Sequence, residues 1–294
     1  MGRQYQTVSF LSDLGQADEL VGVIEAVIRD LAPHAHVVHL AHGVRPFDVR
    51  GGSLALARAV PYVPEGVVLA TVDPGVGTAR RALAIEVAGG AGVLVGPDNG
   101  LLAPAVAVVG GAERAVELVD PAFHLDAPGA TFAGRDVFAP VVAHLCNGVD
   151  LGEFGPGVDP AALMPGLVPL PRAESDGVHA EVLWVDRFGN AQLNVTVEDL
   201  PVDADVLAAT TGGERRAVYR VATFDDLDAG QLGLVVDSHG LLTVVAARRS
   251  AAEELRIDVG DAVVLADGAD APGAPGSAVS TPVVLGPTTP SERR

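Results

Sequence analysis

Residues 66–81 read GVVLATVDPGVGTARR, and this stretch organises the fold that we expect. The strand-forming run stops at Asp-Pro-Gly, because proline lacks a backbone donor and glycine adopts conformations closed to other residues. Asp73 therefore lies at the carboxyl end of a buried strand, where open α/β sheets bind their ligands. Arg80 follows across a short loop, and a carboxylate can orient a guanidinium that keeps spare donors. The pair predicts a water-binding site; a turn with a structural salt bridge is the alternative.

Strands and helices alternate along the first half of the chain. This alternation predicts an α/β N-terminal domain with a mostly parallel sheet and right-handed crossovers. Strands that run into Asp13, Asp73 and Asp98 would gather three carboxylates at one edge of that sheet. The expected strands cover 7–11, 36–40, 66–70, 82–87, 93–95 and 116–119, and the expected helices cover 20–31, 49–60 and a segment that opens at residue 131.

The pattern changes where prolines cluster, between residues 159 and 177. Beyond this point short apolar runs are separated by turns, which indicates a smaller, antiparallel, β-rich C-terminal domain. We expect an N-terminal domain over 1–168, a linker over 169–177 and the C-terminal domain over 178–267. A tail over 268–294 is rich in proline, alanine and threonine, and we expect it to be disordered.

The charge of the chain restricts its partners. Over 294 residues the net charge is −19 and the pI is about 4.6, which argues against nucleic acid and anionic membranes. The longest apolar run is too short to span a bilayer, and the start of the chain lacks a secretory apolar segment. Cys146 is the single cysteine, which excludes a disulfide framework and fits a reducing cytoplasm.

Several shorter motifs each allow two interpretations. Asp13 in Ser-Asp-Leu-Gly can bind the hydroxyls of a ribose or cap a helix. Residues 186–190, DRFGN, offer an aromatic ring for stacking and an amide for recognition, or form a hairpin turn. Residues 98–100 and 237–240 are turn-like. The eight histidines do not cluster at ligand spacing and no phosphate-binding or zinc motif occurs, so we expect no metal.

The order of the motifs is more specific than any one of them. SDLG, PFD, VDPGVGTAR, GPDNGLL, TFAGRD, DRFGN and DSHG follow one another between residues 7 and 266. This order resembles the S-adenosyl-L-methionine (SAM) hydroxide adenosyltransferases, also called adenosine-forming SAM hydrolases, which are relatives of the SAM-dependent fluorinases and chlorinases. The resemblance implies an α/β N-terminal domain, a β-rich C-terminal domain and a homotrimer.

The resemblance also implies the reaction and the place of the substrate. SAM would lie between the N-terminal domain of one subunit and the C-terminal domain of the next. Water or hydroxide would attack the C5′ carbon of SAM, methionine would leave from the sulfonium, and adenosine would result. SAM is the substrate in this scheme and no further cofactor is expected.

The same resemblance implies roles for individual residues. Asp73 and Arg80 match the first two members of the Asp-Arg-His set with which the hydrolases handle water. The positions implied for the substrate are Asp13 for the ribose, Phe47 for the pocket wall, Asp186, Phe188 and Asn190 for the methionine and adenine parts, and Ser238 for the methionine carboxylate.

One position departs from the family pattern. The third member of the set belongs in a TFHGRD motif, and this chain has Ala133 in place of the histidine. Alanine can neither donate, accept nor titrate. Three alternatives follow: Asp73 and Arg80 suffice, another residue such as His124 reaches the site, or the chain binds SAM or adenosine without turnover.

Two other activities remain open from the sequence. SAM-dependent halogenation is the first, and the halogenases lack the Asp–Arg pair. A metal-dependent hydrolase built on Asp13, Asp73, Asp98 and Asp136 is the second, and it lacks histidine partners for the metal.

Overall fold

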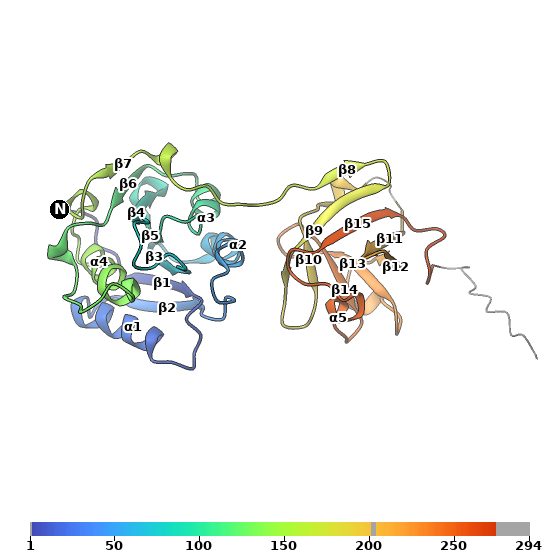
Figure 1. Cartoon of the computed structure of the whole chain (residues 1–294), viewed down its shortest axis with the longest axis horizontal. Coiled ribbons are helices and arrows are strands. Elements are labelled where there is room, and N and C mark those ends of the chain that lie inside the picture. Colours follow the sequence, from blue (N-terminus) through green and yellow to red (C-terminus); the bar gives the residue numbers. More distant parts are fainter. Residues whose placement is uncertain (1, 201–203, 275–294) are drawn as a thin grey trace, which may run out of the picture. The chain divides into compact units, whose positions relative to one another are not determined.

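The computed structural model describes residues 2–200 and 204–274. The chain divides into two compact units, Met1–Val168 and Pro169–Arg294 (Figure 1). Each unit has its own sheet and its own hydrophobic core. No helix among the described residues is long and apolar enough to span a bilayer.

The N-terminal unit is built on a seven-stranded sheet of order β2-β1-β3-β5-β4-β6-β7 (Figure 1). β2, β1, β3 and β5 pair in parallel, so their carboxyl ends lie at the same edge. Asp13 and Asp73 follow the neighbouring strands β1 and β3 and therefore share this edge. The strands are β1 Thr7–Ser12, β2 His36–Ala41, β3 Gly66–Thr71, β4 Ala82–Val87, β5 Gly92–Pro97, β6 Arg114–Glu117 and β7 Gly157–Val158.

This sheet is mixed, so the mostly parallel sheet predicted from the sequence is confirmed only in part, for β2, β1, β3 and β5. β4 runs antiparallel to both β5 and β6, and β6 runs antiparallel to β7. The reason is the length of a connection. Residues 88–91 alone join β4 to β5, whereas a parallel pair needs a crossover of about a dozen residues or more.

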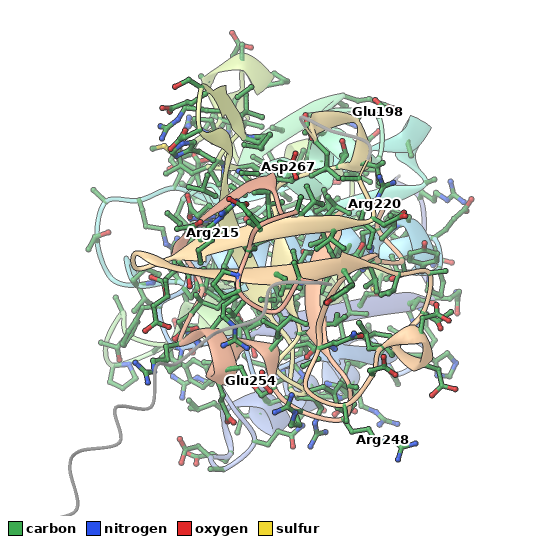
Figure 2. The ribbon with its side chains drawn as sticks, turned by 90° about the vertical axis from the view of Figure 1, so that its right-hand side faces the viewer. Glu198, Arg215, Arg220, Arg248, Glu254 and Asp267 are labelled. Atoms are coloured by element: carbon green, nitrogen blue, oxygen red, sulfur yellow. The ribbon has the colours of Figure 1, made fainter. Side chains whose placement is uncertain are left out.

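The C-terminal unit is an eight-stranded sheet of order β10-β14-β13-β12-β11-β15-β9-β8, and a further pairing of β10 with β9 closes it into a barrel. The predicted antiparallel pairing holds throughout the described strands except between β12 and β13, which are parallel. Arg215 of β12 donates to the carbonyl of Asp267 of β15 at 2.6 Å (Figure 2). The elements are β8 Arg172–Glu174, β9 Gly177–Val185, β10 Ala191–Leu193, β11 Val206–Thr211, β12 Glu214–Arg220, β13 Leu232–Val236, β14 Leu242–Ala246, α5 Ala251–Leu255 and β15 Ala262–Asp267.

Two segments expected to be irregular contain ordered contacts. Strand β8 lies inside the predicted linker, because a tight turn folds it back against β9. Residues 268–274 begin the predicted tail, and the Tyr219 hydroxyl of β12 donates to the carbonyl of Gly273 at 2.5 Å. The rest of the predicted tail, 275–294, lies outside the described residues.

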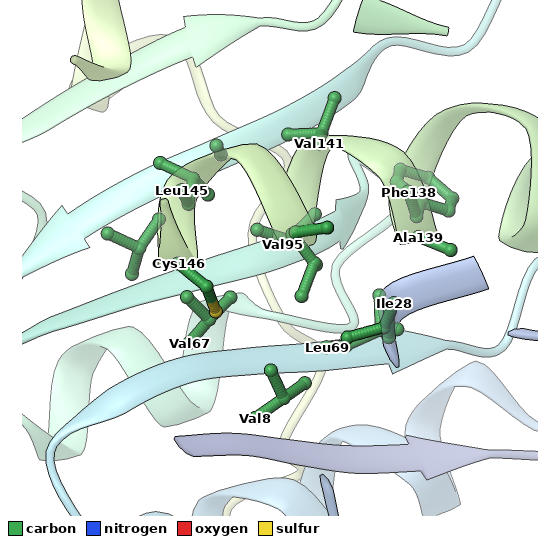
Figure 3. Packing of buried hydrophobic residues seen from close by; sticks show 14 of the residues in the cluster. Val8, Ile28, Val67, Leu69, Val95, Phe138, Ala139, Val141, Leu145 and Cys146 are labelled. Carbon is green, nitrogen blue, oxygen red and sulfur yellow. The ribbon is translucent and has the colours of Figure 1, made fainter. Parts of the chain in front are cut away.

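Helices cover both faces of the N-terminal sheet. Successive side chains of a strand point to opposite faces, so Phe10 of β1 packs with α1 and α4 while Leu11 packs with α2 and α3. Figure 3 shows α4 packed against Val67, Leu69 and Val95 of the sheet. The helices are α1 Leu20–Leu31, α2 Val49–Ala59, α3 Ala103–Val108 and α4 Ala139–Cys146, the last preceded by a π-helical turn, Gly134–Phe138.

Candidate functional site

A cavity of about 300 Å³ opens at the carboxyl edge of β1 and β3. It brings together four residues that the sequence singled out: Asp13, Phe47, Asp73 and Ala133. Much of the remaining wall is apolar and includes Leu20, Val76, Phe132 and Phe138. Two carboxylates therefore face a cavity whose remaining wall is largely apolar, and apolar surroundings strengthen charge interactions.

Asp73 and Arg80 form a nearly buried ion pair beside this cavity. Arg80 Nε donates to Asp73 Oδ1 at 2.9 Å and to Oδ2 at 3.0 Å, and Nη2 donates to Oδ2 as well. The side chain of Arg80 is 14% exposed and that of Asp73 is 10% exposed. The guanidinium carbon of Arg80 lies 5.4 Å from the centre of the Phe138 ring. Breaking such a buried pair costs about 3–5 kcal/mol, so Arg80 is held in one orientation.

The local sequence explains why the loop returns Arg80 to Asp73. The carbonyl of Asp73 accepts the Val76 amide at 3.2 Å, which closes a turn around Asp-Pro-Gly. The Thr78 hydroxyl donates to the Gly75 carbonyl at 2.7 Å and its oxygen accepts the Arg80 amide at 3.3 Å. Two short turns in succession therefore reverse the chain within the loop.

Asp98, the third carboxylate of the sheet edge, has a different task. Arg81 Nε donates to Asp98 Oδ2 at 2.8 Å, and the Met164 amide donates to Oδ1 at 2.8 Å. Arg81 also donates to the carbonyl of Ala162 at 2.6 Å. Asp98 thus fastens the segment around residue 163 and does not line the cavity that holds Asp73.

Asp136 is likewise occupied elsewhere, since it accepts from Arg135 Nε at 2.5 Å. The four aspartates of the proposed metal hydrolase are therefore split between one cavity and two separate ion pairs. Among the described residues, the group whose ligand atoms lie within reach of a single ion is Glu174, Asp176 and His179, on the β8–β9 hairpin of the other unit. The cavity thus brings together two of the four aspartates, and one of them, Asp73, is paired with Arg80.

Asp13 shapes the mouth of the cavity. Its Oδ2 accepts the backbone amide of Phe47 at 2.8 Å. Phe47 has a φ of 69°, in the left-handed region, and 73% of the residue is exposed. The next residue, Asp48, caps α2 by accepting the Gly51 amide at 2.7 Å. Asp13 thus holds the aromatic side chain at the rim in a backbone conformation that only a specific contact maintains.

Ala133 faces the cavity from the start of the π-helical turn, with φ −57° and ψ −26°. His124 does not line this cavity. Its Nε2 is buried and has no hydrogen-bond partner among the described residues, and burial lowers the pKa of its imidazole from the ordinary 6.5. The cavity therefore contains no imidazole at the position where the resemblance would place one.

The C-terminal unit has a second cavity, of about 710 Å³, lined by Asp186, Phe188 and Asn190. Asp186 Oδ1 accepts the amides of Phe188 at 2.8 Å and Asn190 at 2.9 Å, and Oδ2 accepts Asn190 Nδ2 at 2.8 Å. Asp186 therefore builds the turn that presents the other two side chains. Gly189 lets this turn touch α5, because a Cβ there would lie 2.0 Å from Ser250 Oγ.

Sequence reasoning missed the basic residues of this cavity. Arg248 and Arg249 line it, and Arg248 has a left-handed φ of 57° (Figure 2). The available signal was an Arg-Arg pair directly after an apolar strand. Ser238 does not line this cavity: it lies exposed on a turn organised by Asp237. Burial raises the pKa of Asp237, but hydrogen bonds led by that from Gln192 leave it below its ordinary 3.8.

Comparison with known proteins covers both units. Residues 8–155 match the SAM hydroxide adenosyltransferase N-terminal domain, and residues 180–264 match the SAM hydroxide adenosyltransferase C-terminal domain. The chain is 47% identical over 257 residues to a protein of Salinispora arenicola named (R)-S-adenosyl-L-methionine hydrolase, covering 86% of this chain and 95% of that one. A protein of Thermus thermophilus with the same name is 45% identical over 261 residues, covering 86% of this chain and 96% of that one.

A solved structure has the same fold. The crystal structure of an uncharacterized conserved protein from Thermotoga maritima superposes with a TM-score of 0.80 at 32% identity, covering 88% of this chain and 99% of that one. The two domain matches agree with the sequence identities and with the superposition. This chain therefore belongs to the SAM hydroxide adenosyltransferase family.

Proposed function

We propose that this protein hydrolyses SAM to adenosine and L-methionine by attack of water or hydroxide on C5′. The observation that carries the proposal is the buried Asp73–Arg80 pair beside a cavity that also contains Asp13. The names of the Salinispora and Thermus relatives support the same substrate and the same reaction.

Each group of the cavity has a task in this reaction. The sulfonium of SAM is already a good leaving group, so the protein has to bind, desolvate and position the reactants. Asp13 accepts hydrogen bonds from the ribose diol, and Phe47 covers the rim. Asp73 orients Arg80, whose donors hold the water and stabilise developing hydroxide character. Arg80 does not act as a base, because guanidinium stays protonated at neutral pH.

The C-terminal cavity supplies recognition in this proposal. The Asp186 turn presents Phe188 for stacking and Asn190 for hydrogen bonding to the methionine and adenine parts of a substrate held by a neighbouring subunit. Ser238, on the exposed turn outside this cavity, takes the methionine carboxylate in this proposal. This arrangement requires the homotrimer that the family resemblance implies, and light scattering tests it: the mass of a monomer at working concentration would contradict the shared site.

Product analysis in labelled water tests the reaction. In H₂¹⁸O the expected product is adenosine with one ¹⁸O in the 5′-hydroxyl, together with unlabelled methionine, both identified by mass spectrometry. The same incubation with chloride separates the halogenase alternative, which forms 5′-chloro-5′-deoxyadenosine. Formation of the chloride adduct in place of adenosine would overturn the hydrolase proposal.

A non-catalytic binder is the second candidate, and Ala133 is the observation that favours it. Without the histidine, the cavity can retain SAM or adenosine and leave it intact. Calorimetric binding of SAM with no adenosine after prolonged incubation would establish this alternative.

The cellular setting of the enzyme follows from the same proposal. Cys146 is buried, and burial raises the pKa of its thiol to about 12, so it stays unreactive. An unreactive single thiol and a substrate of central metabolism support a cytoplasmic location. SAM, adenosine and methionine are the proposed partners, with neither nucleic acid nor membrane.

A further inference from the structure

A row of hydrogen bonds leads away from the wall of the N-terminal cavity to the protein surface. Ser12 Oγ and His42 Nδ1 lie 2.7 Å apart. His42 Nε2 lies 2.8 Å from His39 Nδ1, and His39 Nε2 lies 3.2 Å from Glu25 Oε2. Four side chains from β1, the segment after β2, β2 itself and α1 are thus joined end to end.

The two inner members of this row are buried and the two outer members are partly exposed. Ser12 is fully buried and His42 is 5% exposed, whereas the side chains of His39 and Glu25 are 40% and 27% exposed. Phe10 packs its edge against the ring of His42, with the ring centres 4.7 Å apart. The inner half is therefore shielded from water and the outer half reaches it.

The inner end lies next to the cavity. Ser12 is paired with Thr71 across β1 and β3, and Thr71 lines the cavity. Thr71 Oγ1 is buried and has no hydrogen-bond partner in the described part of the chain. A buried hydroxyl without a partner is uncommon in a native protein and often marks a functional site. Asp13, which also lines the cavity, directly follows Ser12.

One assignment of hydrogens satisfies the whole row. The Leu14 amide donates to Ser12 Oγ at 3.4 Å, which leaves the hydroxyl proton of Ser12 for His42 Nδ1. His42 then carries its proton on Nε2 and donates to His39 Nδ1. His39 in turn carries its proton on Nε2 and donates to the Glu25 carboxylate. Every donor in this assignment points outward, from the cavity wall to the surface.

The charge state of His42 suits this arrangement. Burial lowers the pKa of His42 below the ordinary 6.5, so the ring is neutral at pH 7, and protonation of His39 would lower it further. A neutral imidazole has one donor and one acceptor nitrogen, and can therefore accept a proton on one side while releasing one on the other. Glu25 at the outer end is also paired with the exposed Arg29 at 3.1 Å through its other carboxylate oxygen.

We propose that Thr71, Ser12, His42, His39 and Glu25 form a path that carries the proton released by SAM hydrolysis from the cavity to solvent. The inference rests on the proposed function. When the water oxygen bonds to C5′, the C5′–S electron pair leaves with methionine and the water loses one proton. The cavity carboxylates Asp13 and Asp73 can hold that proton only until the next turnover, and the row offers it a route to solvent.

The steps along the path balance. Thr71 Oγ1 makes no hydrogen bond to a described residue in the resting structure, so its side chain first rotates toward Ser12. The proton then passes to the Thr71 hydroxyl, which gives its own to Ser12, and Ser12 gives its own to His42 Nδ1. His42 releases the Nε2 proton to His39 Nδ1, His39 releases its Nε2 proton to Glu25, and Glu25 passes it to water. Rotation of the hydroxyls and rings then restores the starting tautomers.

The first test is His42→Asn, which keeps a polar group beside Ser12 but cannot relay. We expect kcat to fall by about tenfold or more, and the KM for SAM to stay unchanged. Removing a positioned acid or base that acts on the substrate itself typically lowers the rate by about 10²–10⁴-fold, and the loss here should be smaller. Imidazole buffer at constant pH and ionic strength should restore kcat, which a merely structural defect would not allow. His36→Asn, an exposed histidine of the same strand, is the control and should keep full kcat.

Two results distinguish a failure of the proposed function from a failure of the proton path alone. A wild-type protein that forms no adenosine overturns the proposed function and the path together. A wild-type protein that turns over, with His42→Asn at full kcat or with a loss that imidazole does not restore, overturns the path alone.

The second test needs no turnover. Long-range ¹H–¹⁵N spectra of the imidazole nitrogens report which nitrogen carries the proton. The path requires neutral His42 with its proton on Nε2 at pH 7, and Glu25→Gln should change the spectrum of His39. Observation of the Nδ1-protonated tautomer or of an imidazolium at His42 would contradict the outward direction.

Discussion

The two cavities of this protein hold their polar groups in different ways. In the N-terminal cavity Asp73 accepts from a guanidinium, and both side chains are nearly buried. In the C-terminal cavity Asp186 accepts from backbone amides of its own turn, and Phe188 is 72% exposed. The first arrangement fixes a charged donor beside its cavity. The second fixes a backbone and leaves the side chains to meet a ligand.

Because of this difference, we expect substitutions in the two units to affect different properties of the protein. A substitution at the ion pair removes a preorganised donor and should act on kcat. A substitution in the C-terminal turn changes the shape of a recognition surface and should act on binding or on the stability of that unit.

Arg80→Ala should have the largest effect. Loss of one preorganised donor lowers kcat by about 10²–10³-fold, and here it also leaves the Asp73 carboxylate unpaired. The assay is adenosine formation, with SAM binding measured separately by calorimetry. Arg81→Ala is the matched control, because it breaks the neighbouring, partly exposed Arg–Asp pair and Arg81 does not line the cavity. Equal losses in the two variants would mean that the effect is structural.

Ala133→His should raise turnover. The backbone at Ala133 is in the right-handed helical region and accommodates any side chain. A positioned general base is worth about 10²–10⁴-fold, and we expect an increase at the lower end. Ala133→Asn fills similar space without titrating and should leave the rate unchanged. If both variants behave alike, the cavity does not use an imidazole at this position.

Asp13→Ala should weaken SAM binding by about 1–3 kcal/mol, the cost of leaving buried ligand hydroxyls unpaired. Asp13→Asn keeps an oxygen for the Phe47 amide and separates the loss of the diol from the loss of the loop anchor. Asp18→Ala, an exposed aspartate nearby, is the control. Unchanged calorimetric affinity of Asp13→Ala would remove Asp13 from the ribose site.

Gly189→Ala should destabilise the C-terminal unit. Its φ of 81° is left-handed, and a Cβ would lie 2.0 Å from Ser250 Oγ. Gly240→Ala is a matched control, since its φ is 80° and a Cβ there meets nothing within 4 Å. Strain in φ alone costs about 1–3 kcal/mol, so thermal melting of Gly189→Ala should lie below that of Gly240→Ala. Identical melting temperatures would show that α5 moves away from the added Cβ without any loss of stability.

The smallest effect concerns pH. Burial lowers the pKa values of His42, His124 and His144 from 6.5. The unfolded chain therefore binds more protons than the native one just below pH 6.5, and the free energy of unfolding should fall as pH decreases through this window. Urea unfolding at pH 7.5, 6.5 and 5.5 measures it. The lowered pKa values of Asp150 and Asp237 act only below pH 3.8, so a flat profile between 7.5 and 5.5 would contradict the histidine contribution.

Local sequence determined a large part of this protein. The apolar run that ends at Asp-Pro-Gly predicted β3 and the place of Asp73, because proline and glycine act on the backbone at their own positions. The helical spacing from Leu20 to Leu31 predicted α1 with the bounds it has. The ordered set of motifs identified the family, which the domain matches confirm.

Tertiary structure alone decided the remainder. Strand order and the reversal of β4 depend on hydrogen bonds between residues far apart in the chain, which no local pattern contains. The same holds for the Asp13–Phe47 contact, for Arg248 beside Phe188, and for the row from Ser12 to Glu25. Side chains scattered along the sequence become neighbours only when the sheet and its helices pack together, because burial fixes positions that local conformational preference leaves free.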